Sequence, residues 1–281
     1  MPCTDFCSKV SITHLTTATA ILSIDNVNFI TDPVFSSAGT KMKYESKVLK
    51  DGSVVLQNSF GPALGLESLP PIDAVLLSHE DHADNLDDLG RRLLDGRKVI
   101  TTMDGAKNLQ PRPGVRGIRP WETIPLEVGG KTFQITGVPT RHVPGEECTG
   151  FILECDTFGT NSKGLSNVIY FSGDTVYIDE MNEIRKKYHV CVAILNLGKA
   201  IMPSHDGPLQ ITMDGKQAGR LVKNLDVGLM VPIHFEGWGH FTQCKEELNR
   251  NFEEEGISNR VCWVTPGKPT TLVSGSDNGH F

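Results

Sequence analysis

The chain has 281 residues, which allows one large α/β domain or two small ones, because single hydrophobic cores stop growing at roughly 250–300 residues. Its composition of 38% hydrophobic and 22% charged residues is that of a globular chain and excludes a disordered one. The formal net charge of −7 argues against a nucleic-acid partner, since binding to phosphate backbones requires clustered Lys and Arg.

The N-terminal segment MPCTDFCSKVSITHL lacks the basic and apolar regions of a secretion signal. No apolar run reaches the length of about 18 residues that a membrane helix needs. We therefore expect a cytoplasmic protein without a membrane partner. The seven cysteines, an odd number spread over a long chain, do not indicate a disulfide framework, and we expect them to be reduced. The close pair Cys3 and Cys7 receives no role.

Strands are predicted at the start of the chain. VSITHL at 10–15 is followed by ATAILSI at 18–24 and VNFITD at 27–32, and the turn pair Asp25-Asn26 between the last two predicts a hairpin. Residues 34 to about 72 show neither a strand nor a helix period. This segment is therefore predicted to be a long functional loop.

A buried strand, DAVLLS at 73–78, precedes a histidine cluster. The leucines of LDDLGRRLLDGR at 86–97 recur at helical spacing. The histidines are thus expected where a strand meets a helix.

The rest of the chain predicts a single domain over residues 1–281, in which strands and helices recur in two similar halves. The predicted strands are KVITT (98–102), GVRGI (114–118), KTFQITGV (131–138), TGFILEC (149–155), NVIYFSG (167–173), CVAILNL (191–197), DVGLMVPIHF (226–235) and a closing VCWVT (261–265). The predicted helices are 176–190, 213–225 with Thr212 as N-cap, and the acidic 244–256. The polar residues 274–281 are expected to be a disordered tail.

The segment 78–85, SHEDHADN, concentrates two imidazoles and three carboxylates after the apolar strand. Imidazole nitrogen and carboxylate oxygen are the usual ligands of metals such as zinc, and a strand-to-helix loop can aim several of them at one point. The alternative is a solvated acidic loop with two surface histidines. Three further polar residues, each after an apolar strand, favour a metal site: His142, Asp174 and His234.

The ordered set of the histidine cluster, R-H at 141–142, S-G-D-T at 172–175 and P-I-H at 232–234 resembles the metallo-β-lactamase superfamily. More narrowly, it resembles the branch of metal-dependent hydrolases that includes ascorbate-6-phosphate lactonase. The resemblance runs from ILSIDNVNFITDPVF to VPIHFEGWGHF. It implies an α/β (α+β) fold, the four-layered αββα sandwich, with the metals at one edge of the two sheets.

The resemblance also implies a ligand set. One metal is held by His79, His82 and His142, and Asp174 bridges it to a second metal, which is held by Asp84, Asp174 and His234. The chain departs from the family pattern H-x-H-x-D-H, because two residues separate His79 from His82 and Asn85 stands in the place of the last histidine. An amide is a weaker ligand than imidazole. The alternatives are therefore one ion or two, with zinc expected first and manganese or iron as alternatives.

Such a metal lowers the pKa of bound water to about 7. We therefore expect hydrolysis of a small-molecule lactone, ester or amide by a metal-bound hydroxide. The predicted catalytic residues are Asp84 as a proton carrier, His240, and Glu236 as support for a ligating histidine; the predicted substrate-binding residues are Trp238, His205 and Arg141. Core packing is the alternative for Trp238, and a surface position is the alternative for His240 and His205.

Three other functions stay open at this point. They are hydrolysis of a small phosphoester or phosphodiester, metal binding without catalysis, and a redox role, which Asn85 disfavours because a di-iron centre needs a full set of carboxylates and histidines. Metal content together with turnover separates these functions. The natural substrate and the oligomeric state do not follow from the sequence.

Overall fold

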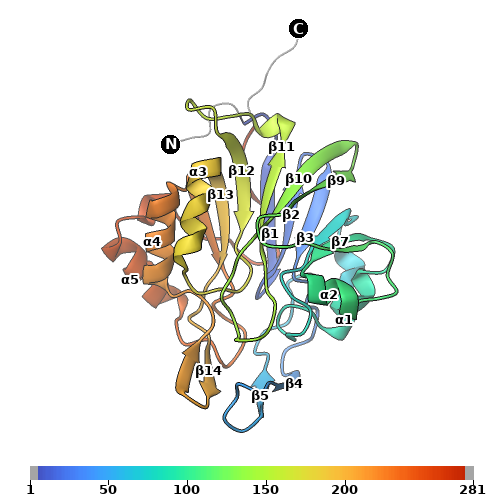
Figure 1. Cartoon of the computed structure of the whole chain (residues 1–281), viewed down its shortest axis with the longest axis vertical. Helices are drawn as coiled ribbons and strands as arrows, with labels where there is room; N and C mark the ends of the chain where they lie inside the picture. The colour runs from blue at the N-terminus through green and yellow to red at the C-terminus, as the bar shows by residue number, and fades with distance from the viewer. Residues whose placement is uncertain (1–5, 276–281) are drawn as a thin grey trace.

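Strands whose apolar side chains alternate in direction build two facing sheets. The computed structural model describes residues 6–275, which contain a seven-stranded sheet in the order β17-β1-β2-β3-β6-β7-β8 and a six-stranded sheet in the order β16-β13-β12-β11-β10-β9 (Figure 1). The first sheet consists of β1 (Val10–Thr16), β2 (Thr19–Ile24), β3 (Val27–Thr31), β6 (Ala74–Leu76), β7 (Lys98–Thr101), β8 (Val115–Gly117) and β17 (Thr270–Val273). The second consists of β9 (Thr123–Val128), β10 (Lys131–Val138), β11 (Gly150–Cys155), β12 (Ser166–Phe171), β13 (Tyr188–Asn196) and β16 (Leu229–Ile233).

The core lies in three apolar layers, as the alternation along a strand requires. In β11, Phe151 and Leu153 face the space between the sheets, whereas Ile152 faces the other side. That other side is covered by α4 (Gly215–Leu225) and α5 (Lys245–Glu254). The outer face of the first sheet packs against the apolar residues around α1 (Asp88–Leu93). The predicted four-layered αββα arrangement is therefore confirmed.

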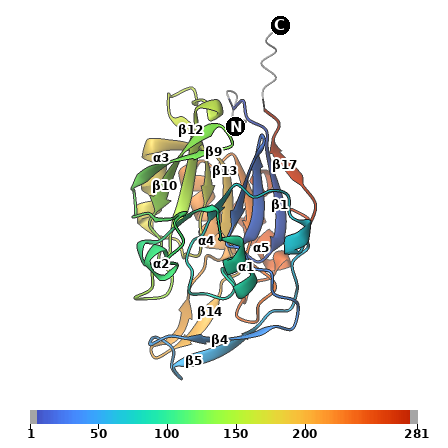
Figure 2. The same cartoon turned by 90° about the vertical axis from the view of Figure 1, so that its right-hand side faces the viewer.

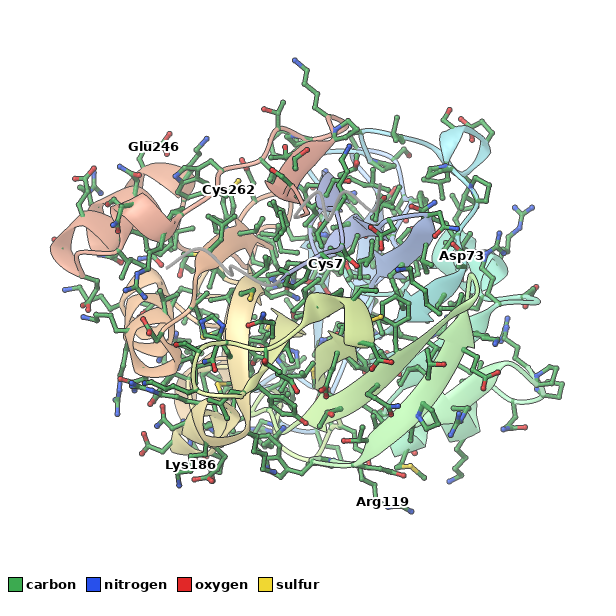
Figure 3. All side chains as sticks on the ribbon, turned by 90° about the horizontal axis from the view of Figure 1, so that it is seen from above. Cys7, Asp73, Arg119, Lys186, Glu246 and Cys262 are labelled. Atoms are coloured by element: carbon green, nitrogen blue, oxygen red, sulfur yellow. The ribbon has the colours of Figure 1, made fainter. Side chains whose placement is uncertain are left out.

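The layers are visible from three directions. In Figure 1 the sheets stand between α1 on the right and α3 (Ile184–Lys187) with α4 on the left. Turned by 90°, α1 faces the viewer in front of the sheets (Figure 2). Seen from above, side chains fill the space between the sheets, and the labelled Arg119, Lys186 and Glu246 lie on the outside of the molecule (Figure 3).

The strongest strand predictions are confirmed. β2 and β3 form the predicted hairpin, with Ile24 opposite Val27 across the turn. Strands occupy the predicted apolar runs from β6 to β13, and α5 ends before Gly256, as predicted. Asp87 caps α1, because its carboxylate accepts a hydrogen bond from the backbone N–H of Gly90 at 2.7 Å.

The prediction of an irregular loop over 34–72 is wrong in part. This segment contains a hairpin of β4 (Lys41–Glu45) and β5 (Ser53–Gln57), followed by a short 3-10 helix, η1 (Leu66–Ser68). Charged residues occupy the exposed positions of β4, so its apolar signal is only Met42 and Tyr44. A second hairpin, β14 (Ile201–Ser204) with β15 (Gly207–Gln210), was also missed.

Three element ends are corrected. The cap of α4 is Asp214, which accepts a hydrogen bond from the N–H of Gln217, whereas the hydroxyl of Thr212 bonds to the carbonyl of Leu197. The helix predicted over 176–190 is confined to η3 (Asp179–Glu183) and α3, because β13 already begins at Tyr188. Residues 261–265 form no strand beyond a single bridge at Val261, and the closing strand is β17, which pairs with β1. The short helix α2 (Met103–Asn108) and strand β9 were not predicted.

The remaining expectations concern the cysteines, the termini and the membrane. Cys148, Cys155, Cys244 and Cys262 carry free thiols, but Cys191 is disulfide-bonded. The prediction of reduced cysteines is wrong at Cys191, because an odd count in a long chain excludes a framework of disulfides and not a single bond.

Cys3 and residues 276–281 of the predicted tail lie outside the described residues. No helix within 6–275 is long and apolar enough to cross a membrane.

Candidate metal centre

The candidate ligands follow strands that end at one edge of the sandwich. His79 and His82 follow β6, His142 follows β10, and Asp174 and His234 follow β12 and β16. β10 runs antiparallel to β11, which runs antiparallel to β12, and β12, β13 and β16 are parallel, so the carboxyl ends of β10, β12 and β16 meet at the same edge. This edge lies at the end of the molecule where the hairpins of β4–β5 and β14–β15 project (Figure 1).

Three imidazoles form the first group. Ligand atoms of His79, His82 and His142 all lie within 4.8 Å of one another, and all three residues are buried. The shortest separation is 3.1 Å, between Nδ1 of His82 and Nε2 of His142.

The hydrogen bond made by the outward-facing nitrogen of each ring determines whether the inward-facing nitrogen carries a proton. Nδ1 of His142 lies 2.8 Å from the carbonyl of Ile211, which can only accept, so this nitrogen carries the proton. Nε2 of His82 donates in the same way to the carboxylate of Glu146 at 2.9 Å. The inward-facing nitrogens of both rings are therefore unprotonated in the neutral imidazoles, with their lone pairs directed at each other.

His79 has a longer chain of support. Its Nδ1 lies 2.8 Å from the hydroxyl of Ser78, which donates its own proton to Asp32 at 2.8 Å. When Asp32 is ionised the hydroxyl therefore accepts from His79, and Nε2 of His79 is left as a buried atom without a hydrogen-bond partner among the described residues. Outward hydrogen bonds of this kind are typical of histidines that hold a metal.

The second group combines two carboxylates with an imidazole. Ligand atoms of Asp84, Asp174 and His234 lie within 4.8 Å of one another, and all three residues are buried. Nε2 of His234 is 3.3 Å from Oδ2 of Asp174 and 3.6 Å from Oδ2 of Asp84. Oδ2 of Asp174 is also 4.0 Å from Nε2 of His142, so Asp174 lies between the two groups. Its other oxygen accepts a hydrogen bond from Asn196 at 2.6 Å.

The charges of the two groups differ. Burial, together with the neighbouring His82, lowers the pKa of His142 to about 4. Burial and the same neighbours hold the pKa of His79 well below its ordinary value. Burial also disfavours the charged form of His234, but Asp174 and Asp84 outweigh it and raise its pKa to about 9. Burial also disfavours the charged form of His82, but its hydrogen bond to Glu146 and the nearby carboxylates outweigh it and raise its pKa. At neutral pH His79 and His142 thus offer free lone pairs, whereas the second group contains a proton that a cation could replace.

The donor set fits a metal ion of the zinc type. Four imidazole nitrogens and two carboxylates are the ligand types that such metals prefer. Nε2 of His79 is buried without a hydrogen-bond partner in the described part of the chain, and Nε2 of His234 faces the carboxylates of Asp84 and Asp174. A buried imidazole nitrogen without a partner and two converging buried carboxylates are costly unless a cation is shared between them.

The amide nitrogen of Asn85 is engaged by Asp32, whereas its Oδ1 is buried without a hydrogen-bond partner among the described residues. The residue is fully buried, and its amide donates to Oδ2 of Asp32 at 3.1 Å. Asp32 also accepts from the backbone N–H of Ser78 at 2.6 Å. Asn85 and Ser78 therefore both anchor the histidine segment to the end of β3.

The other predicted site residues differ in their distance from the candidate ligands. His240 is near, because its Nε2 lies 3.3 Å from Oδ2 of Asp84. Trp238 is buried and donates to the hydroxyl of Thr17 at 3.1 Å, which is the packing role that was the alternative. Glu236 is exposed, and its predicted support of a ligating histidine is not met, since the second nitrogen of His234 lies 3.5 Å from the carbonyl of Leu197.

The last two predicted substrate-binding residues lie outside the centre. His205 is exposed in the turn between β14 and β15. Arg141 is exposed and lines a different cavity, with Tyr177 and Arg220. Arg141 and His142 both lie in the irregular segment after β10, in which His142 is buried and Arg141 is exposed.

A nearly closed cavity covers the centre. Its volume is about 10 Å³, close to the minimum that one water molecule requires. The walls are partly the candidate metal-site residues and partly apolar groups from the two hairpins. The lining residues are Tyr44, Leu56, His82, Ala83, Asp84, His142, Asp174, Met202, Ile211 and His240.

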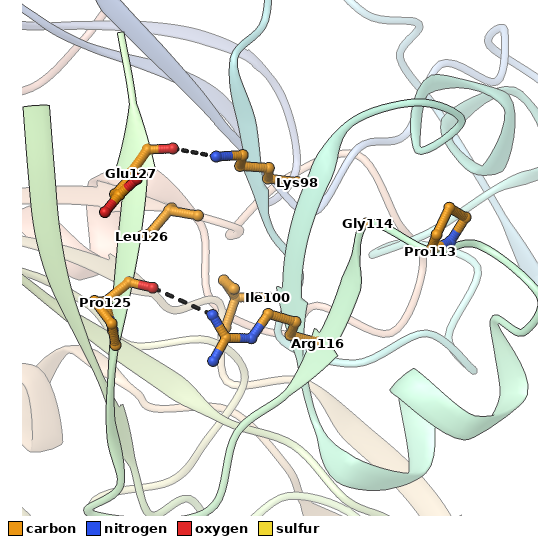
Figure 4. Close-up of a pocket in the computed structure, with 8 residues that line it drawn as sticks. All are labelled: Lys98, Ile100, Pro113, Gly114, Arg116, Pro125, Leu126 and Glu127. Carbon is orange, nitrogen blue, oxygen red and sulfur yellow. Dashed lines mark hydrogen bonds between the residues drawn. The ribbon is translucent and has the colours of Figure 1, made fainter. Parts of the chain in front are cut away.

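Larger cavities lie elsewhere. One of about 420 Å³ separates β7 and β8 from β9, and its sides are joined by hydrogen bonds from Lys98 to the carbonyl of Glu127 and from Arg116 to that of Pro125 (Figure 4). It contains neither histidine nor a converging set of acids, so size alone does not locate the site.

Sequence reasoning missed two residues at the centre, Glu146 and Tyr44. Glu146 lies four residues after His142 in the loop between β10 and β11, and Tyr44 lies in the segment predicted to be irregular. The only available signal was the alternation KMKYE in β4, which places Met42 and Tyr44 on one face.

Comparisons with known proteins identify related sequences and a related fold. The family model described as "Beta-lactamase superfamily domain" matches residues 27–235. The UPF0173 protein YddR of Bacillus subtilis is 23% identical over 277 residues, which is 94% of this chain and 100% of that protein. A UPF0173 metal-dependent hydrolase of Methanosarcina mazei is 25% identical, covering 82% of this chain and 94% of its own length. The crystal structure of an isothiocyanate hydrolase from Delia radicum gut bacteria shares the fold, with a TM-score of 0.73 and 19% identity over 92% of this chain and 98% of that one.

Proposed function

Because the chain belongs to the beta-lactamase superfamily domain family, we propose that it is a metal-dependent hydrolase that cleaves a small, uncharged lactone, ester or amide. The observation that carries the metal requirement is the convergence of His79, His82 and His142, whose ligand atoms lie within 4.8 Å of one another at buried positions, with Nε2 of His79 left without a hydrogen-bond partner among the described residues. Relatives named metal-dependent hydrolases support the reaction class.

Zinc is the metal that we propose first. His79, His82 and His142 would hold one ion, and Asp84, Asp174 and His234 would hold another, with Asp174 shared. When bound, such an ion supplies Lewis acidity and makes a water molecule acidic enough to ionise near neutral pH. The position of Asp174 between the two groups favours two ions.

The chain's own residues supply a proton carrier. Nε2 of His240 lies 3.3 Å from Oδ2 of Asp84, the residue is buried at the cavity wall, and its Nδ1 has no hydrogen-bond partner among the described residues. An imidazole held in this way can carry a proton between a reacting group and Asp84. His240 is therefore proposed as the catalytic acid and base, with Asp84 as its partner.

The walls suggest the substrate class. Leu56, Met202 and Ile211 are apolar, and none of the described residues that line the cavity is a lysine or arginine. A phosphoester would bring an anion that needs a cationic partner beyond the metal. This lining favours a neutral carbonyl substrate over a phosphoester, and it counts against a phosphorylated lactone as in the branch that the sequence resembles.

The test is turnover by zinc-loaded protein on four probes of similar size: a phenyl ester, a γ-lactone, an anilide and bis(4-nitrophenyl) phosphate. We expect cleavage of at least one carbonyl probe, lost in His142→Ala and retained in His189→Ala, which changes a histidine at the opposite end of β13. Cleavage of the phosphodiester alone would replace the substrate class. Stoichiometric zinc without any turnover would favour the alternative of a metal-binding protein without catalysis.

A further inference from the structure

A single carboxylate connects the candidate ligand His82 to the β4–β5 hairpin, which covers the cavity. Oε2 of Glu146 accepts from Nε2 of His82 at 2.9 Å and lies 2.7 Å from the hydroxyl of Tyr44. Its other oxygen accepts from the hydroxyl of Ser46 at 2.8 Å. Tyr44 also packs its ring edge-on against His82, with 4.6 Å between ring centroids. The β4 strand and the turn that follows it are thus bonded to the same group that orients His82.

The β4–β5 hairpin must move before a substrate can enter the cavity. Tyr44 and Leu56 of the β4–β5 hairpin form one side of a cavity that is too small for any organic substrate. Apart from the bonds to Glu146, two backbone hydrogen bonds join the turn of this hairpin to the β14–β15 hairpin. The N–H of Lys50 donates to the carbonyl of Pro203, and the N–H of His205 donates to the carbonyl of Val48. The two hairpins also share a small apolar cluster around Leu49 and Met202. Such a limited attachment can open locally without unfolding the sandwich.

We propose that Glu146 is a positioning residue that latches the β4–β5 hairpin over the centre and couples its closure to the orientation of His82. Opening the hairpin removes the Tyr44 and Ser46 hydroxyls from Glu146, which leaves this carboxylate bonded to His82 alone. Fixing His82 on a metal likewise fixes Glu146 as an acceptor for the hairpin. The latch itself follows from the contacts, whereas the coupling to metal rests on the proposed function.

Glu146 has the surroundings of a hydrogen-bond acceptor and not those of a metal ligand. Glu146, His82 and Asp81 also lie within 4.8 Å of one another, but Asp81 is exposed. Both oxygens of Glu146 are already engaged by three donors, which is the surrounding of an acceptor that orients its neighbours. The role assigned here is therefore that of an outer partner of His82.

The first experiment measures hydrogen exchange of the amides in residues 41–57 in metal-free protein. Tyr44→Phe removes the hydroxyl and keeps the ring against His82. Lys43→Ala is the matched control, because Lys43 lies on the same strand and pairs with the exposed Glu45. A hydrogen bond to a charged group is strong enough that its loss should speed hairpin exchange by about tenfold or more in Tyr44→Phe. Equal exchange in the two variants would overturn the latch.

The second experiment adds zinc alone to the parent protein, Glu146→Gln and Lys43→Ala. We expect zinc to slow hairpin exchange in the parent and in Lys43→Ala. In Glu146→Gln we expect zinc binding to weaken by about 10- to 100-fold, with the exchange of β10 to β13 unchanged. The visible spectrum of bound cobalt(II) should shift in Glu146→Gln and not in Lys43→Ala, because a purely structural role would leave the ligand field of His82 unchanged.

The outcomes separate the two proposals. Zinc that binds the parent without slowing hairpin exchange would overturn the coupling and leave the metal site intact. A parent that binds no zinc would contradict the proposed function and the coupling together, while the metal-free comparison of Tyr44→Phe with Lys43→Ala would still decide the latch.

Discussion

The metal-free protein should lose stability as pH rises from 6.5 to 9. His234 is fully buried, and its pKa is raised from 6.5 to about 9 because Asp174 and Asp84 outweigh the effect of burial. A group with a raised pKa in the folded state contributes stability that is fully present below the unfolded value and is lost as pH rises through the folded value. The shift corresponds to a loss on the order of 3 kcal/mol.

A second buried group acts in the same direction. Burial raises the pKa of Asp32 from 3.8 to about 8, so the folded state binds its proton more tightly and loses stability as pH rises towards 8. Within the window above pH 6.5 this adds about 2 kcal/mol. His142, with a pKa lowered to about 4, titrates below this window. The two losses together are a large part of the 5–15 kcal/mol that is typical of a folded protein, by the order of magnitude.

The assay is urea denaturation in the presence of a chelator at pH 6.5, 7.5, 8.5 and 9. Asp174→Asn keeps the hydrogen bond from Asn196 and removes the main charge that raises the pKa of His234, so its free energy of unfolding should fall by about half as much as that of the parent. Asp226→Asn is the control, because Asp226 is an exposed helix cap whose lowered pKa lies far below the window. A parent whose stability is constant or rises over this range would refute the reasoning, as would an unchanged decline in Asp174→Asn.

Three other predictions address the support of the site and of the fold. Ser78→Ala removes the acceptor of the His79 ring proton and should weaken zinc binding by about 10- to 100-fold, as measured by competition with a chromophoric chelator; unchanged affinity would show that Ser78 does not orient His79. Phe133→Ala, which empties a ring-sized space between the sheets beside Phe29, should cost about 3–5 kcal/mol of unfolding free energy, and a loss below 1 kcal/mol would contradict the assigned core. Asp214→Ala should cost about 1 kcal/mol through loss of the cap of α4, whereas Lys216→Ala on the exposed side of the same helix should cost much less.

The strands that could be predicted from the sequence are those in which buried apolar side chains alternate over a few neighbouring residues. β10 to β13 alternate between two apolar layers, so runs such as KTFQITGV contain enough information to place a strand. The two hairpins at the site edge contain much less. Their strands are partly exposed, and they are held by contacts with residues far away in the chain, such as Leu49 with Met202. Propensity alone therefore could not separate them from a loop.

The site residues likewise differ in how far a local sequence pattern could predict their positions. Residues such as His142 and His234 stand out because a polar residue directly after a buried strand is placed at a sheet edge, and the structure brings them together. Trp238 and His205 were predicted to face the substrate, yet one hydrogen bonds to Thr17 and the other lies exposed in a turn. The direction of a side chain in an irregular loop depends on tertiary contacts, which no local pattern records. Glu146 was missed for the same reason.

The most direct test of the account is the number of zinc ions bound per chain, measured by elemental analysis after loading and desalting. We expect about two ions in the parent and in His189→Ala, and fewer in both His142→Ala and Asp174→Ala, because Asp174 lies between the two groups of ligands. A parent that retains no zinc after loading, or a His142→Ala variant that retains as much as the parent, would contradict the assignment of these side chains as a metal centre.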